Sequence, residues 1–176
     1  YVAGLLGSSA LFGMMFGAMG FGMLSDRVGR KKVIIGCVVL FSVTTVVNGL
    51  ATTPWQFGVL RFIAGLGIGG VMPNVVSLMS EYSPARKRST LVALMFSGYA
   101  VGGMISAGLG IWIVPNFGWQ IMFYLAGVPM LLLPLMLKYL PESVAFLMAQ
   151  RRENEARYVL QQIAPLMNIR KDDVLE

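Results

Sequence analysis

Two kinds of binding site compete for the stretch LRFIAGLGIGG, residues 60–70 of the chain. Gly65, Gly67 and Gly70 match the G-x-G-x-x-G spacing of a turn that binds a dinucleotide phosphate. The same stretch contains Arg61, a permanent cation among apolar neighbours, which is suited to binding a carboxylate. Whether the stretch is a phosphate-binding loop or an apolar segment that contains a charge depends on the elements around it.

The composition already limits the possible chemistry. The chain has 176 residues, of which 56% are hydrophobic and only 12% are charged, about half the charged fraction of an ordinary soluble domain. It contains no histidine and a single cysteine, Cys37, which excludes an intrachain disulfide and a His/Cys metal cluster. No nucleophile–base pair is visible either. The sequence therefore predicts that the protein is not an enzyme and has no resident metal or cofactor.

Long segments of the chain carry no charge at all, the first of them being residues 1–24. A bilayer core needs about 20 apolar residues at about 1.5 Å per residue. The turn PNFGWQ (115–120) divides the longest uncharged run, which is too long for one crossing. The sequence therefore predicts an all-α integral membrane protein, with spans at about 1–24, 33–53, 55–79, 89–114 and 119–140.

The basic residues predict the orientation in the membrane. Segment 25–32 holds four Lys or Arg residues, segment 81–88 holds three, and the segment from residue 138 onward holds six. The alternate connections, TTPW and PNFGWQ, hold none. Because Lys and Arg collect on the cytoplasmic side, we expect the basic segments and the C-terminus in the cytoplasm and residue 1 outside. The net charge of +6 is then explained by the membrane topology. It does not indicate a nucleic-acid partner. We expect a multi-pass protein of the cell membrane, of the inner membrane in a bacterium.

The glycines of the opening stretch lack the context of a dinucleotide site. No strand precedes them, and the next acidic residue is Glu81. Glycines in the middle of membrane spans instead let helices approach closely. Small residues spaced four apart occur in three spans, at Ser9/Gly13/Gly17, Gly65/Gly69 and Gly98/Gly102.

Arg61 lies about six residues, roughly 9 Å, below the outer end of the third span. All eight acidic residues belong to the cytoplasmic side, and Glu81 is ~30 Å away along the helix. No carboxylate of this chain is expected to reach Arg61. We expect a functional cation that faces a cavity. The alternative is that its side chain snorkels to the outer headgroups.

The first inner segment carries a recognisable motif. GMLSDRVGRKK (22–32) resembles the signature G-x-L-[SA]-D-R-x-G-R-[RK]-[RK] of the major facilitator superfamily. The third span resembles the R-x-x-x-G-x-G-x-G helix of that superfamily, and PES (141–143) ends the last span as in many members. The signature residues in this chain are Gly22, Asp26, Arg27, Gly29, Arg30 and Lys31.

A narrower resemblance rests on residues 73–109 and 117–143, which are similar to the aromatic acid:proton symporter family and most of all to its benzoate and 4-hydroxybenzoate transporters. It implies two six-helix bundles built from inverted repeats of three helices. The five spans would be the second to the sixth, so that the first helix and the C-terminal half are missing. The resemblance also implies that Asp26, Arg61 and Glu81 act in gating and in proton or substrate handling.

Beyond Pro141 the composition becomes that of a soluble segment. We expect residues 141–176 to form a cytoplasmic linker with an amphipathic helix at about 143–164, capped by Ser143 and stopped by Pro165. The alternative is a loose tail.

The sequence thus predicts a secondary transporter that imports a small aromatic carboxylate with protons, by alternating access. Its expected partners are the aromatic acid, the proton, the lipid bilayer and the missing C-terminal half. Asp26, Arg30 and Glu81 are expected to share an ion-pair network at the inner gate. Two alternatives stay open: a porter of sugars or other organic anions, and a non-transporting receptor or scaffold. Sugar porters usually continue PESPR, whereas this chain reads PESVAF.

Overall fold

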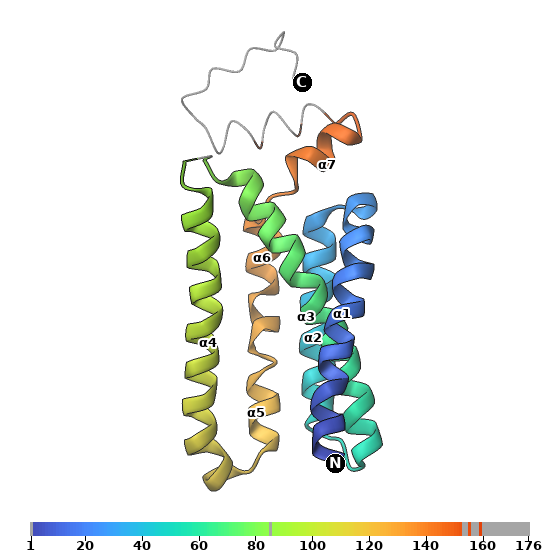
Figure 1. Cartoon of the computed structure of the whole chain (residues 1–176), viewed down its shortest axis with the longest axis vertical. Helices are drawn as coiled ribbons and strands as arrows, with labels where there is room; N and C mark the ends of the chain where they lie inside the picture. The colour runs from blue at the N-terminus through green and yellow to red at the C-terminus, as the bar shows by residue number, and fades with distance from the viewer. Residues whose placement is uncertain (1, 85, 153–154, 156–158, 160–176) are drawn as a thin grey trace.

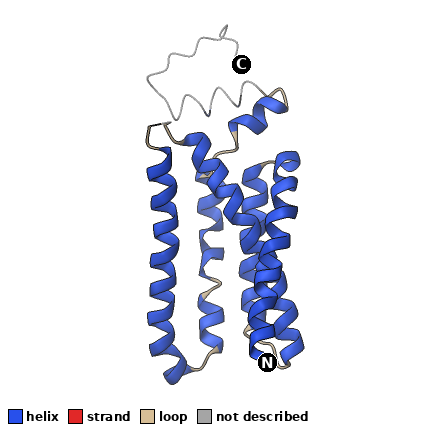
Figure 2. Cartoon of the chain, viewed as in Figure 1, coloured by secondary structure: helices blue, strands red, loops and turns tan. Residues whose placement is uncertain are grey.

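The computed structural model describes residues 2–84 and 86–152, together with 155 and 159. Within these residues the regular structure is entirely helical, as Figure 2 shows. Five segments are long and apolar enough to cross a membrane, which confirms the predicted fold class. The helices are α1 (Val2–Val28), α2 (Arg30–Asn48), α3 (Pro54–Tyr82), α4 (Arg88–Phe117), α5 (Gln120–Leu125), the 3-10 helix η1 (Val128–Leu132), α6 (Leu133–Tyr139) and α7 (Val144–Ala149).

Helices α1, α2 and α3 form a bundle (Figure 1). Beside this bundle stand the α5–η1–α6 segment, which forms one column, and α4. α3 packs against both α1 and α2, and the buried apolar side chains gather mainly on α2 and α3. The column formed by α5, η1 and α6 lies along α2. α4 stands on the far side of this column and is exposed along most of its length. α3 is therefore the central helix of the bundle, against which both α1 and α2 pack.

Glycines allow α1 and α3 to meet backbone to backbone. A Cβ atom at any of four glycines would lie 2.1–2.2 Å from a carbonyl oxygen of the facing helix, a distance that no side chain tolerates. The contacts are reciprocal, with Gly13 against Phe62, Gly17 against Leu66, Gly65 against Ala10 and Gly69 against Met14.

The glycines of α4, also expected to pack closely against a helix, have no such neighbour among the described residues. A Cβ atom at Gly98 or Gly102 would have no neighbour within 4 Å among the described residues. The spacing is the same as in α1 and α3, but this face of α4 has no helix against it here. Small-residue spacing permits close packing, and a facing helix is still needed to produce it.

The basic segment 25–32, which lies between the predicted spans 1–24 and 33–53, is helical except for one residue. α1 continues to Val28 and α2 begins at Arg30, because the charged ends of the helices extend past their apolar parts. Gly29 alone reverses the chain direction, with φ at +107°. Residues other than glycine rarely adopt a positive φ of this size, so the turn depends on the glycine of the motif.

The α2–α3 and α4–α5 connections also differ in detail from the predicted turns. Thr53 caps α3, since its hydroxyl accepts a hydrogen bond from the Gln56 amide at 3.3 Å, and Pro54 occupies the first helical turn. α4 continues through Pro115 to Phe117, and the chain turns only at Gly118, where φ is +89°.

The last apolar segment, expected as one span at 119–140, is broken into α5, η1 and α6. Pro129 lies in η1 and Pro134 near the start of α6. Each proline lacks the N–H that an α-helix needs for its hydrogen bond four residues back. The segment retains the length of a membrane crossing, from Gln120 to Tyr139.

After Pro141 the chain enters the short helix α7, with Ser143 as its N-cap. The Ser143 hydroxyl accepts a hydrogen bond from the Phe146 amide at 3.2 Å. Of the amphipathic helix expected at 143–164, the structure describes residues 143–152, 155 and 159, and α7 ends at Ala149. Most of the remaining linker, including Pro165, lies outside the described residues.

The glycine contact gives a first prediction. Gly17→Ala should lower the stability of the purified protein by about 1–3 kcal/mol, because the new methyl group overlaps the Leu66 carbonyl and forces the helices apart. Gly20→Ala is the matched control on the same helix, since nothing lies within 4 Å of its Cβ position. Thermal unfolding in detergent measures both, and an equal effect of the two substitutions would contradict the packing role.

Candidate functional site

A cavity of about 330 Å³ lies between the helices toward the end of the bundle where α2 ends and α3 begins, and its volume is within the size range of small-molecule sites. One face each of α2 and α3 supplies most of its wall. The residues on these faces follow helical spacing and are Phe41, Thr45 and Asn48 on α2, and Arg61, Ala64, Gly65 and Ile68 on α3. α1, α4, α5 and the residue that follows α5 complete the wall with Ala10, Met14, Ser106, Met122, Phe123 and Ala126.

Arg61 is the cation of this cavity. Its guanidinium carbon lies 5.3 Å from the ring centroid of Phe57 and 5.1 Å from that of Phe123. No carboxylate of the described residues forms an ion pair with it. Aromatic faces attract the positive charge but leave the N–H donors in the guanidinium plane unused. The cavity therefore offers a planar set of hydrogen-bond donors that matches a carboxylate.

Polar atoms of α2 lie in the wall beside this cation. Asn48 is 1% exposed, and neither its Oδ1 nor its Nδ2 has a hydrogen-bond partner among the residues that the structure describes. The hydroxyl of Thr45 is buried and unpaired in the same way. Sequence reasoning missed both residues. The sequence signal that could have indicated them is a pair of polar side chains, three residues apart, within an apolar span.

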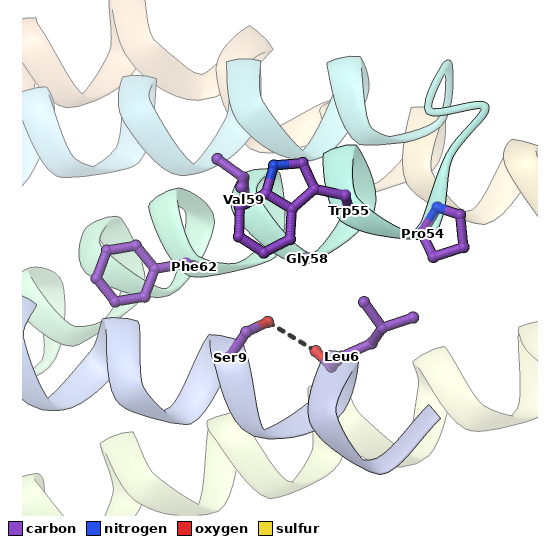
Figure 3. A pocket seen from close by; sticks show the side chains of 7 residues that line it. All are labelled: Leu6, Ser9, Pro54, Trp55, Gly58, Val59 and Phe62. Atoms are coloured by element: carbon purple, nitrogen blue, oxygen red, sulfur yellow. Dashed lines mark hydrogen bonds between the residues drawn. The ribbon is translucent and has the colours of Figure 1, made fainter. Parts of the chain in front are cut away.

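A second hollow is a poorer candidate for an anion. It lies between the N-terminal parts of α1 and α3, has a volume of about 440 Å³ and is shown in Figure 3. The Ser9 hydroxyl in its wall already donates to the Leu6 carbonyl at 2.8 Å. No charged residue lines this hollow, whose lining is Leu6, Ser9, Pro54, Trp55, Gly58, Val59 and Phe62.

At the opposite end of the bundle, Arg30 lies between two carboxylates. Its guanidinium donates to Glu81 and lies 3.9 Å from Asp26. The side chains of Arg30 and Glu81 are 18% and 21% exposed, whereas that of Asp26 is 72% exposed. The three-residue ion-pair network expected from the sequence is thus present. Its stronger contact joins the start of α2 to the end of α3.

Residues of the PES segment complete this network. The Ser143 hydroxyl donates to the second oxygen of Glu81 at 2.7 Å, so the cap of α7 is bound to α3. The Glu142 carboxylate accepts from the backbone N–H groups of Lys31 and Ser143, each at 3.0 Å. The Tyr82 hydroxyl donates to the Glu142 carbonyl. Sequence reasoning used PES only as the end of a span and missed these contacts.

The structure places the other motif residues around this cluster. A Cβ atom at Gly29 would lie 2.6 Å from the Glu142 carboxylate, so the glycine makes room for that carboxylate. The Lys31 ammonium donates to the Leu137 carbonyl at 2.8 Å. Arg27 is exposed, and the Cβ position of Gly22 has no neighbour within 4 Å. The last two residues therefore take no part in the described contacts.

The chain thus has an apolar helical bundle with a cation-lined cavity at one end and an ion-pair cluster at the other, and it matches a known class of protein. The family described as "Sugar (and other) transporter" matches residues 1–174. The chain belongs to this family, which is part of the major facilitator superfamily, as expected from its motifs. The family is one of transporters, in agreement with the prediction that the chain is not an enzyme.

Several relatives in this family are named for aromatic acids. The chain is 49% identical to the benzoate transport protein of Acinetobacter baylyi over 98% of its length. It is 44% identical to the 4-hydroxybenzoate transporter PcaK of Pseudomonas putida over 90% of its length, and 44% identical to the gentisate transporter of Corynebacterium glutamicum over 81%. The chain spans between 33% and 38% of the length of these relatives.

Solved structures of the superfamily share the fold. The proton:xylose symporter XylE bound to 6-bromo-6-deoxy-D-glucose superposes with a TM-score of 0.85 at 25% identity, over 92% of this chain and 40% of that one. The partially occluded inward-open form of XylE from E. coli gives a TM-score of 0.84 over 92% of this chain and 44% of that one.

The cluster at Arg30 generates a prediction about stability. Glu81→Gln should lower the free energy of unfolding by about 1–3 kcal/mol, because it leaves a mostly buried guanidinium without its counter-charge. Asp26→Asn should cost about 0–1 kcal/mol, because that carboxylate is largely exposed. Denaturant unfolding of the two variants side by side makes the comparison, and a larger loss for Asp26→Asn would contradict the geometry.

Proposed function

We propose that the protein is a secondary active transporter that imports a small aromatic carboxylate together with protons, by alternating access. The Arg61 cavity is the observation that carries this proposal, because it combines aromatic walls with a cation that has no carboxylate partner in the described part of the chain. The names of the relatives, which include benzoate, 4-hydroxybenzoate and gentisate transporters, support the substrate class. The metal-free, cofactor-free chemistry expected from the sequence is sufficient for this activity.

In this proposal the carboxylate of the substrate binds the guanidinium of Arg61 through two parallel hydrogen bonds. The aromatic ring of the substrate packs beside Phe41 and Phe123, which line the same cavity. The half-buried position of Arg61 in the cavity wall favours this role over snorkelling to the headgroups.

Proton coupling follows from the electrical cost of importing an anion. A benzoate-like carboxyl group titrates near pH 4, as side-chain carboxyls do, so it is an anion at about pH 7. An inside-negative potential opposes entry of such an anion by about 2.3 kcal/mol per 100 mV. One proton carried with each anion removes this cost, and the pH gradient then drives accumulation. A second proton would add the electrical potential as a driving force.

The cluster of Asp26, Arg30, Glu81 and Ser143 is proposed as the cytoplasmic gate. Its contacts join α1, α2, α3 and the start of α7, and alternating access requires such contacts to break and re-form. This role assumes the orientation predicted from the basic residues, with 25–32, 81–88 and the C-terminus in the cytoplasm. It also assumes that residues 141–176 form a cytoplasmic linker and that further helices complete the transporter.

A sugar porter is the second candidate. The matching family is described as "Sugar (and other) transporter", and the superposed XylE structure is that of a proton:xylose symporter. A sugar is neutral, however, so it would provide no counter-charge for Arg61 in the cavity. Competition by glucose or xylose distinguishes the two candidates.

Arg61 can be tested directly. Arg61→Gln should reduce proton-coupled uptake of the aromatic acid by at least about tenfold, the effect of losing a hydrogen-bonded charge. Arg61→Lys should restore uptake only in part, because lysine lacks the planar pair of donors. Arg86→Gln, which changes an exposed arginine between α3 and α4, serves as the control. Parental uptake by Arg61→Gln would show that the side chain only reaches for the outer headgroups.

The transport reaction itself gives the main test. The full-length protein in liposomes with an acidic exterior should accumulate labelled benzoate or 4-hydroxybenzoate above the level of protein-free liposomes. The protein-free control corrects for leak of the neutral acid. A protonophore should abolish the protein-dependent part, because the proton gradient is the driving force, and glucose should not compete.

Three outcomes would count against this proposal. Uptake that ignores the protonophore would rule out proton coupling. Competition by glucose would assign the protein to the sugar porters. A complete absence of accumulation, with the protein correctly assembled, would favour a receptor or scaffold.

A further inference from the structure

Thr45 and Asn48 are two buried polar residues of α2, and we call them the polar stripe. Both residues line the Arg61 cavity, and they lie on the same face of the helix as Phe41. Their three polar side-chain atoms, Thr45 Oγ1, Asn48 Oδ1 and Asn48 Nδ2, are buried and have no hydrogen-bond partner among the described residues. Buried polar atoms are almost always paired, so these atoms point to a ligand.

Several other polar side chains of the same spans are paired within their own helix, although the buried Ser42 hydroxyl of α2, which does not line the cavity, also has no partner among the described residues. The hydroxyl of Thr44 donates to the Leu40 carbonyl at 2.6 Å, one turn earlier. The amide of Asn74, which is equally buried, donates to the Gly70 carbonyl at 2.7 Å. This local solution is the usual one for such side chains in a helix. The polar stripe does not use it, although Thr45 is the immediate neighbour of Thr44.

The type of polar atom indicates what the ligand must supply. A carboxylate offers only acceptors, so the Arg61 guanidinium and the Asn48 amide nitrogen could serve it. The Asn48 Oδ1 atom is itself an acceptor and needs a donor. A hydroxyl group both donates and accepts, which matches the amide of Asn48 and the hydroxyl of Thr45. A ligand with a carboxylate and a separate hydroxyl would therefore offer partners both to Arg61 and to the polar stripe.

We propose that Thr45 and Asn48 form a specificity subsite that binds a ring hydroxyl of an aromatic carboxylate whose carboxylate is held by Arg61. This proposal rests on the proposed function and deepens it. The subsite distinguishes hydroxylated from unsubstituted rings, because a ring without the hydroxyl leaves the buried polar atoms unpaired.

The test measures preference and not total activity. The full-length protein in liposomes takes up labelled benzoate, while unlabelled benzoate and the 2-, 3- and 4-hydroxybenzoates are added in turn as competitors. The readout is the half-inhibitory concentration of each hydroxybenzoate divided by that of unlabelled benzoate. A general loss of protein or of turnover leaves this ratio unchanged, so the readout isolates the contact with the hydroxyl.

Two variants and one matched control address the subsite. Asn48→Leu and Thr45→Val remove the polar atoms with little change in volume. For at least one hydroxybenzoate, each should raise the ratio roughly three- to tenfold, the effect of one lost hydrogen bond. Thr44→Val removes a neighbouring hydroxyl that is already paired inside the helix, and it should leave every ratio unchanged. If Asn48→Leu does not assemble, the comparison of Thr45→Val with Thr44→Val decides alone.

The outcomes separate this inference from the function on which it rests. Accumulation of benzoate with parental ratios for all three isomers in both variants would overturn the subsite and leave the transporter standing; the cavity would then hold only water there. An equal shift in Thr44→Val would also overturn it, as a general disturbance of α2. No accumulation by the parent protein would overturn the transport function, and the subsite with it.

Discussion

The direct contact of two backbones, α1 against α3, is the constraint on which the rest of the structure depends. Four glycines allow it, and each faces a carbonyl oxygen at a distance where no Cβ atom fits. In a bilayer, no hydrophobic driving force holds helices together, so close van der Waals contact must do it. The contact sets the position of α3, and α3 carries residues of both the cavity and the ion-pair cluster. Larger side chains at these positions would move both sites at once.

α3 joins two sites with opposite electrostatic characters. Near its start, Arg61 faces aromatic rings and has no carboxylate partner among the described residues. Near its end, Glu81 binds both Arg30 and Ser143. The two residues are ~30 Å apart along the helix, about the thickness of the hydrocarbon core. A charge without a partner is expensive at such a position, whereas the paired cluster costs little. The unpaired charge is therefore where an external anion gains most by binding.

The features that sequence reasoning recovered are those set by local pattern. Charge-free runs predicted the membrane segments, and opposite charges at the helix ends predicted the contact of Arg30 with Asp26 and Glu81. The features it missed depend on tertiary placement. Whether a helical threonine bonds its own helix or faces a cavity depends on its rotamer and neighbours, so Thr44 and Thr45 look alike in sequence. The contacts of Glu142 need the chain to return to the α1–α2 junction. Gly98 and Gly102 repeat the spacing of Gly65 and Gly69, but no helix faces them here.

The single-residue connection at Gly29 keeps the adjoining ends of α1 and α2 close together. The far ends of the two helices have more freedom to move relative to each other. Consecutive Cα atoms are about 3.8 Å apart, so the adjoining ends of α1 and α2 cannot separate by more than a few ångströms. The connection between α2 and α3, residues 49–53, is longer and has no such limit. Any change in the angle between α1 and α2 must therefore pivot at Gly29, with little displacement there. The displacement grows with distance along the helices and is largest at the far end, where Asn48 lines the cavity.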